Sequence, residues 1–169
     1  MSRSRAAALA LAALVSGCGG AEHLDRVDID QRALDVDACA RGESSCARTG
    51  RVTSVESFVP GDGHAVRLDP GGAIEGPLMR PSPTARLAML VLGYRAVGDE
   101  GVPRELRLGL ASGGSAPRVG LVSIKTTNAS FRVVEVSELD AVPPADAHVR
   151  IESTTGVIEV IYVIGRWKN

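Results

Sequence analysis

Aromatic side chains are scarce in this sequence. The 169 residues include one Trp, two Tyr and two Phe, or 3% of the chain. The hydrophobic core must therefore rest on Val, Leu, Ile and Ala. A surface that stacks sugars on aromatic rings has few residues from which it could be built, and these are Phe58, Tyr94, Phe131, Tyr162 and Trp167.

The sequence also lacks a basic cluster and a membrane-spanning apolar segment. It has 19 Lys and Arg against 20 Asp and Glu, for a net charge of -1 at pH 7. Nucleic acid is not expected as a partner, because its phosphate backbone attracts clustered Lys and Arg. The apolar stretch from Ala6 to Val15 is much shorter than the roughly 20 residues that cross a bilayer as a helix.

Patterns typical of metal sites and catalytic sites are missing as well. His23, His64 and His148 do not have metal-ligand spacing. The tract GGSAP, residues 113 to 117, comes near the nucleophile elbow G-x-S-x-G, but Pro117 stands where the motif needs Gly. We therefore expect a non-catalytic protein and no cofactor. A hydrolase with an unrecognised site stays an alternative, since strand carboxylates such as Glu159 could be brought together by the fold.

The N-terminus has the layout of a removable secretory signal. Arg3 and Arg5 precede the apolar stretch, which ends in Val15, Ser16, Gly17 and Cys18. These four residues resemble the lipobox of bacterial lipoproteins. The resemblance implies that residues 1–17 are removed, that the Cys18 sulfur receives a lipid, and that the protein is held in the cell envelope. Gly19 in place of Asp resembles the signal for the outer membrane. The alternative is an ordinary secretory signal with an unmodified Cys18.

If Cys18 carries lipid, Cys39 and Cys46 remain as a pair. An oxidising envelope permits a disulfide between them, and this is our prediction. Metal or redox use is less favoured, because the spacing is not Cys-x-x-Cys. We expect residues 18–50 to form the lipidated N-terminus, an acidic tether and this disulfide loop.

The hydrophobic period becomes two after Arg51. RELRLGL and SFRVVEV both alternate apolar and polar residues, which is typical of half-buried strands. Gly-rich and Pro-rich turns separate the strand candidates. The sequence therefore predicts an all-β fold, a single antiparallel β-sandwich over residues 51–169. Beyond those two segments, the strand candidates are Val52–Val59, His64–Leu68, Ala73–Leu78, Ala85–Ala96, Val119–Thr126, His148–Glu152 and Val157–Arg166.

Three segments together resemble the galactose-binding-like jelly rolls, the fold of many carbohydrate-binding modules. They are FVPGDGHAVRLDPGGAIEGPL, RELRLGL and the closing pair HVRIES and GVIEVIYVIGRW. The resemblance implies loops that bind sugars, peptides or lipids at one end of the sandwich. It also implies a structural calcium ion, for which Asp62 and Asp69 are candidates, although Asp in a turn commonly bonds its own backbone. Tyr162 has the parity of core residues, and Trp167 is either a sugar platform or a core residue.

These patterns favour a lipid-anchored envelope module that binds without catalysis. We expect it to contact an envelope protein through the loops 96–104 and 112–118. Their candidate contact residues are Asp99, Glu100, Arg104 and Arg118. Binding of a glycan, with Trp167 as a platform, is the alternative.

Overall fold

The structure is a computed structural model that describes residues 28–59, 63–112, 121–137 and 141–168. Strands make up most of this part of the chain. In chain order the elements are β1 (Ile29–Leu34), α1 (Val36–Arg41), β2 (Ala47–Thr49), β3 (Val52–Glu56), β4 (His64–Leu68), β5 (Ala73–Pro77), β6 (Arg86–Val97), β7 (Arg104–Ser112), β8 (Val122–Thr126), β9 (Phe131–Val136), β10 (Ala147–Thr155) and β11 (Val157–Lys168).

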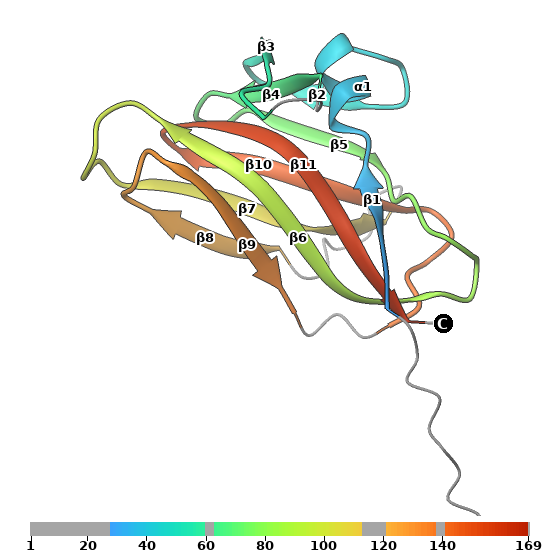
Figure 1. The fold of residues 1–169 in the computed structure, drawn as a ribbon. Coiled ribbons are helices and arrows are strands. Elements are labelled where there is room, and N and C mark those ends of the chain that lie inside the picture. Colours follow the sequence, from blue (N-terminus) through green and yellow to red (C-terminus); the bar gives the residue numbers. More distant parts are fainter. Residues whose placement is uncertain (1–27, 60–62, 113–120, 138–140, 169) are drawn as a thin grey trace, which may run out of the picture.

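The strands form two stacked antiparallel sheets (Figure 1). The six-stranded sheet has the order β3-β4-β11-β6-β9, and β1 also pairs with β11. The five-stranded sheet has the order β2-β5-β10-β7-β8. The expected all-β antiparallel sandwich is therefore confirmed. No helix in the described ranges is long and apolar enough to cross a membrane.

The core lies between the two sheets and follows the period of two in the strands. Inward-facing residues of both sheets are fully buried, among them Leu92 in β6, Leu108 in β7 and Ile151 in β10. Alternate residues on each strand point outward. Each sheet therefore has an outer face, and the outer face of the six-stranded sheet is toward the viewer in Figure 1.

The sandwich begins earlier in the chain than expected. The segment predicted to be part of the tether contains β1, which pairs with β11 from Ile29↔Trp167 to Leu34↔Val163. The register shifts at Ala33, and Asp30 faces outward to bond Arg166. The bulge and the charged outward residues hide the strand period in the sequence. From Ile29 onward, the tether expectation is therefore wrong.

The predicted disulfide is present and lies at the edge of the core. Cys39 in α1 is bonded to Cys46, just before β2, with a Cα–Cα distance of 5.1 Å. Both cysteines are buried. Asp35 caps the start of α1 by accepting a hydrogen bond from the Ala38 amide. Arg48 donates to the Cys39 carbonyl at the other end of the helix. The bridge and these bonds fasten the short helix to the sandwich.

Candidate ligand-binding face

A β-bulge in β11 decides which aromatic residues face outward. Val160 pairs with Tyr94 in β6, but Tyr162 pairs with the next residue, Gly93, so that Ile161 is the extra residue. Val160 is inward-facing and fully buried, whereas Tyr162 after the bulge is outward and half-buried. The expectation that Tyr162 belongs to the core is therefore wrong, because the bulge reverses the parity on which it rested.

Tyr162 lies flat against a glycine on the neighbouring strand. A Cβ atom added to Gly93 would lie 2.4 Å from Tyr162 Cζ and 2.5 Å from Cε1. The ring therefore occupies the space that any larger residue at position 93 would fill. Only a glycine in this position of β6 allows so close an approach of ring and backbone.

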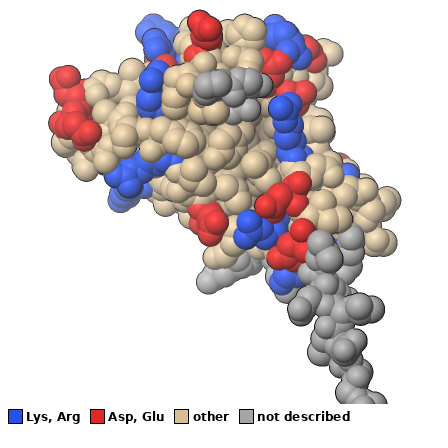
Figure 2. Space-filling model, viewed as in Figure 1, with Lys and Arg blue, Asp and Glu red and all other residues tan. Residues whose placement is uncertain are grey.

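Two phenylalanines continue from Tyr162 across the outer face. Phe131 of β9 packs edge to face with Tyr162, with ring centroids 6.3 Å apart. Phe58, after β3, packs edge to face with Phe131 at 5.5 Å. Phe58 is 37% and Phe131 38% exposed. We call Phe58, Phe131 and Tyr162 the aromatic row. Figure 2 shows this face of the molecule, with uncharged atoms in its middle and charged side chains around them.

A buried carboxylate flanked by two arginines lies beside the aromatic row. Glu159 of β11 is 1% exposed. Its Oε1 accepts from Nε and Nη2 of Arg67 in β4, at 3.1 and 2.6 Å, and its Oε2 accepts from Nε of Arg95 in β6 at 2.8 Å. The Arg95 Cζ atom lies 4.3 Å from the centroid of the Phe58 ring, a cation–π contact. The two guanidinium groups are thereby fixed at the surface.

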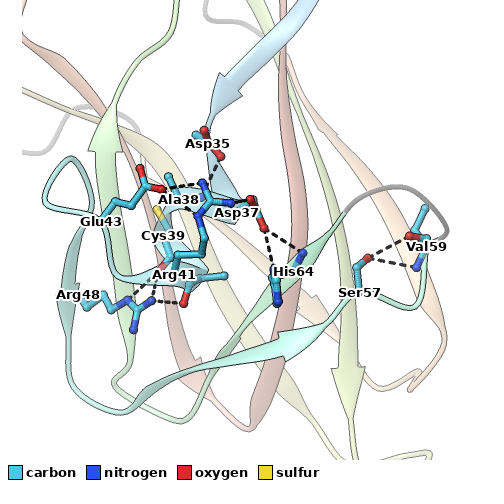
Figure 3. A network of polar contacts seen from close by, with 11 residues as sticks. Asp35, Asp37, Ala38, Cys39, Arg41, Glu43, Arg48, Ser57, Val59 and His64 are labelled. Carbon is cyan, nitrogen blue, oxygen red and sulfur yellow. Dashed lines mark hydrogen bonds and ion pairs between the residues drawn. The ribbon is translucent and has the colours of Figure 1, made fainter.

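A groove runs along the other side of Tyr162. It has a volume of about 360 Å³ and lies between β1, the start of α1 and β11. Leu34, Ile161 and Ile164 line its apolar part, and Arg32 and Asp37 its polar part. Figure 3 shows Asp37 bonded to both Arg41 and His64. Asp37 Oδ1 lies 3.0 Å from His64 Nδ1. The carboxylate in the groove is therefore already paired.

The far end of the same face carries an acidic cluster around an arginine. Arg166 of β11 donates from Nε to Oδ1 of Asp30 at 3.0 Å. This hydrogen bond, together with the charges of Asp30, Glu135 and Asp28, raises the pKa of Arg166. The acidic side chains of this end are thus gathered around a cation and lie apart from the aromatic row.

Two residues predicted to contact a ligand have structural roles instead. Trp167 is fully buried in the core, which excludes it as an exposed sugar platform. Arg104 is 3% exposed and donates to the backbone carbonyls of Val97, Asp99 and Val102 at 2.7 to 3.1 Å. Its side chain therefore holds the turn between β6 and β7 together. The predictions that Trp167 and Arg104 contact a ligand are therefore wrong.

The remaining predicted loop residues are spread over the molecule. Asp99 and Glu100 are exposed in the β6–β7 turn. Near that turn, an open hollow of about 420 Å³ is lined by Pro103, Lys125 and neighbouring residues. Arg118, at the other candidate loop, lies outside the described residues.

Of the predicted calcium ligands and the lipidation site, the structure describes only Asp69. Asp69 pairs with Arg51 and closes a turn through a 2.7 Å hydrogen bond from the Gly72 amide to its carbonyl. Asp62 and Cys18 are not among the described residues. Within the described ranges, no three His, Cys, Asp or Glu side chains are grouped so that they could hold a metal ion.

The sequence matches no protein-family model and no curated protein. Solved structures nevertheless share its fold. A carbohydrate-binding module from lichenase 5A of Cellvibrio mixtus, in complex with cellotriose, superposes with a TM-score of 0.50 and 16% identity, over 83% of this chain and 96% of the module. The K1 cleaved adhesin domain of Lys-gingipain from Porphyromonas gingivalis gives 0.51 and 10%, over 82% of this chain and 97% of that domain.

A larger protein contains the same sandwich. The catalytic domain of Agl-KA superposes with a TM-score of 0.53 and 10% identity, over 82% of this chain. The chain spans only 27% of that protein. Identities this low establish the fold and leave function to be argued from the residues of the site. The fold is thus a β-sandwich of the kind found in carbohydrate-binding modules.

Proposed function

We propose that this protein is a non-catalytic glycan-binding module that presents the aromatic row to its ligand. The observation that carries the proposal is the outward position of Tyr162 against Gly93, next to the exposed Phe131 and Phe58. Aromatic rings offer a large, rigid contact area at low entropic cost. The likeness of the fold to a carbohydrate-binding module adds support.

Binding without catalysis agrees with the state of the carboxylates on this face. Glu159 is buried and accepts from two arginines, and Asp37 is paired with Arg41 and His64. Both carboxylates already accept hydrogen bonds from cationic side chains of the protein, an arrangement that suits the holding of a ligand.

We further propose that Cys18 carries the lipid anchor and that the protein lies in the bacterial cell envelope, in the outer membrane. Because β1 begins at Ile29, ten residues, 19–28, separate Cys18 from the sandwich. Ten extended residues span at most about 35 Å, so the module would stay close to the membrane. Mass spectrometry of the membrane fraction tests the anchor, and an unmodified Cys18 thiol would contradict it.

Glycan binding is tested with the purified protein on an array of neutral and charged polysaccharides. We expect Tyr162→Ala to weaken the binding of any glycan found by about tenfold, since an aromatic contact is worth up to about 1.5 kcal/mol beyond its buried area. Val122→Ala is the matched control, because Val122 is 40% exposed on β8 of the other sheet. Equal binding by wild type and Tyr162→Ala, or no binding to any glycan, would overturn the proposal.

An envelope protein is the alternative occupant of this face. The structural likeness to an adhesin domain favours keeping this possibility in the test. Cross-linking in intact envelopes from a residue beside the aromatic row would capture such a partner. Recovery of one specific protein whose capture is not reduced by added glycan would favour the alternative over glycan binding.

A further inference from the structure

Positive charge lies next to the aromatic row on one side. Two arginines, Arg67 and Arg95, share the single carboxylate of Glu159. Their side chains are 41% and 38% exposed. Both use Nε and Nη2 for Glu159, so that Nη1 of each remains outside the pair. The cluster therefore has an excess of one positive charge and donors that a ligand can reach.

A further positive charge lies beyond Tyr162 along β11, on the side away from Glu159. Arg32 of β1 is exposed and borders the groove, and it pairs across the strands with Ile164, two residues beyond Tyr162. No described residue forms an ion pair with Arg32. On β6, Arg95 is two residues from Gly93, which lies under the Tyr162 ring. Residues two apart on a strand are about 7 Å apart on the same face, so cations lie within reach on both sides of the ring.

The acidic residues of the face do not cancel this charge. Asp37 in the groove is bonded to Arg41 and His64. Asp30 and Glu135 lie at the far end, around Arg166. The arginines beside the aromatic row therefore keep their excess positive charge, although the whole chain has a net charge of -1. This separation of charge is complementary to a polyanion.

We propose that the ligand of this face is an anionic polysaccharide, whose sugar ring packs on Tyr162 while its carboxylate or sulfate groups are bound by Arg95 and Arg67 on one side and by Arg32 on the other. This inference rests on the proposed glycan binding and specifies the class of glycan. Guanidinium groups bind planar oxyanions with paired hydrogen bonds. Glu159 is a positioning residue that holds two of the guanidinium groups in place.

The inference is tested by affinity electrophoresis of the purified full-length protein in gels that contain one polymer each. Polygalacturonate supplies carboxylates, dextran sulfate supplies sulfates, and dextran is the neutral control. Inorganic polyphosphate supplies charge without a sugar ring. We expect retardation by polygalacturonate, by dextran sulfate or by both, with little by dextran and polyphosphate, and we expect it to fall at high salt because the contacts are ionic.

Variants then assign the binding to this face. Arg32→Gln should weaken binding to the anionic glycan about three- to tenfold. Arg107→Gln should leave it unchanged, because Arg107 is exposed on β7 in the other sheet. Arg95→Gln should weaken binding more strongly, with its thermal unfolding measured in parallel because Glu159 loses a partner. Arg32 has no partner among the described residues, so its variant remains informative if Arg95→Gln unfolds.

The outcomes separate this inference from the function on which it rests. Binding to dextran as tight as to the charged polymers, or an unchanged affinity in Arg32→Gln, overturns the anionic ligand and leaves glycan binding standing. Equal binding to polyphosphate shows that charge suffices without a sugar, which also overturns the inference. A protein that binds no glycan on the array and none of these polymers overturns both proposals.

Discussion

Gly93→Ala tests the contact on which the proposed binding face depends. The added Cβ would lie 2.4, 2.5 and 2.8 Å from three carbon atoms of the Tyr162 ring. Ordinary carbon–carbon contacts are about 3.5 to 4.0 Å, so the ring must move by about 1 Å or turn away. Gly93 is not among the glycines with positive φ, so the backbone itself accepts alanine.

The expected free-energy change combines two opposing effects. Overpacking costs about 1–3 kcal/mol, and replacing a glycine inside a strand by alanine contributes about 0.5–1 kcal/mol of stability. In the wild-type background we therefore expect a net loss of about 0.5–2 kcal/mol. In a Tyr162→Ala background the ring is absent, and the same substitution should stabilise the protein by about 0.5–1 kcal/mol. The sign of the effect should thus depend on Tyr162.

Urea unfolding of the wild type, both single variants and the double variant measures this dependence. We expect a coupling energy of about 1–3 kcal/mol between positions 93 and 162. Additivity within about 0.5 kcal/mol would show that the ring does not lie on the glycine. The reasoning about the aromatic row would then fail as well, whatever the glycan measurements show.

Further predictions concern the core and the turns. Replacing Cys39 and Cys46 by Ser should lower the free energy of unfolding by about 2–3 kcal/mol, since the bridge closes a short loop; an unchanged urea midpoint would refute this. Burial raises the pKa of Tyr94 above its ordinary 10.0, so the unfolded chain ionises first and stability should fall above about pH 10. Tyr94→Phe should flatten that fall, and an equally steep decline would contradict the assignment. Arg104→Met should cost about 2–4 kcal/mol through three unsatisfied carbonyls, against less than about 0.5 kcal/mol for Arg107→Met.

The sandwich could be predicted from the sequence because its signals are local. The alternation of apolar and polar residues in segments such as RELRLGL indicates strands with one buried face, and Gly and Pro mark the turns between these strands. The strand expected at Ala85–Ala96 is observed as β6, Arg86–Val97, despite its apolar character on both faces. The disulfide was predicted differently, from the two cysteines that remain after Cys18 and from an oxidising compartment, and it is observed.

The positions that sequence reasoning missed depend on contacts between distant segments. Glu159 and Arg67 are 92 residues apart, and no local pattern indicates that their strands pair. Arg104 was expected at the surface as a charged loop residue, but three carbonyls of its own turn satisfy it inside. β1 was not predicted, because its bulge and its outward charged residues interrupt the apolar–polar alternation in a strand of only six residues.

One extra residue in β11 explains both results for the aromatic residues of the last strand. Without a bulge at Ile161, the alternation that buries Ile158 and Val160 would continue to Tyr162 and leave Trp167 outside. With it, Trp167 faces inward, where a Cβ added to Gly165 would lie 2.7 Å from its Nε1. Tyr162 faces outward against Gly93 in the same manner. The bulge therefore places one aromatic ring on a glycine in the core and another on a glycine at the surface, so that this strand both completes the core and supplies the ring on which the proposed binding face is built.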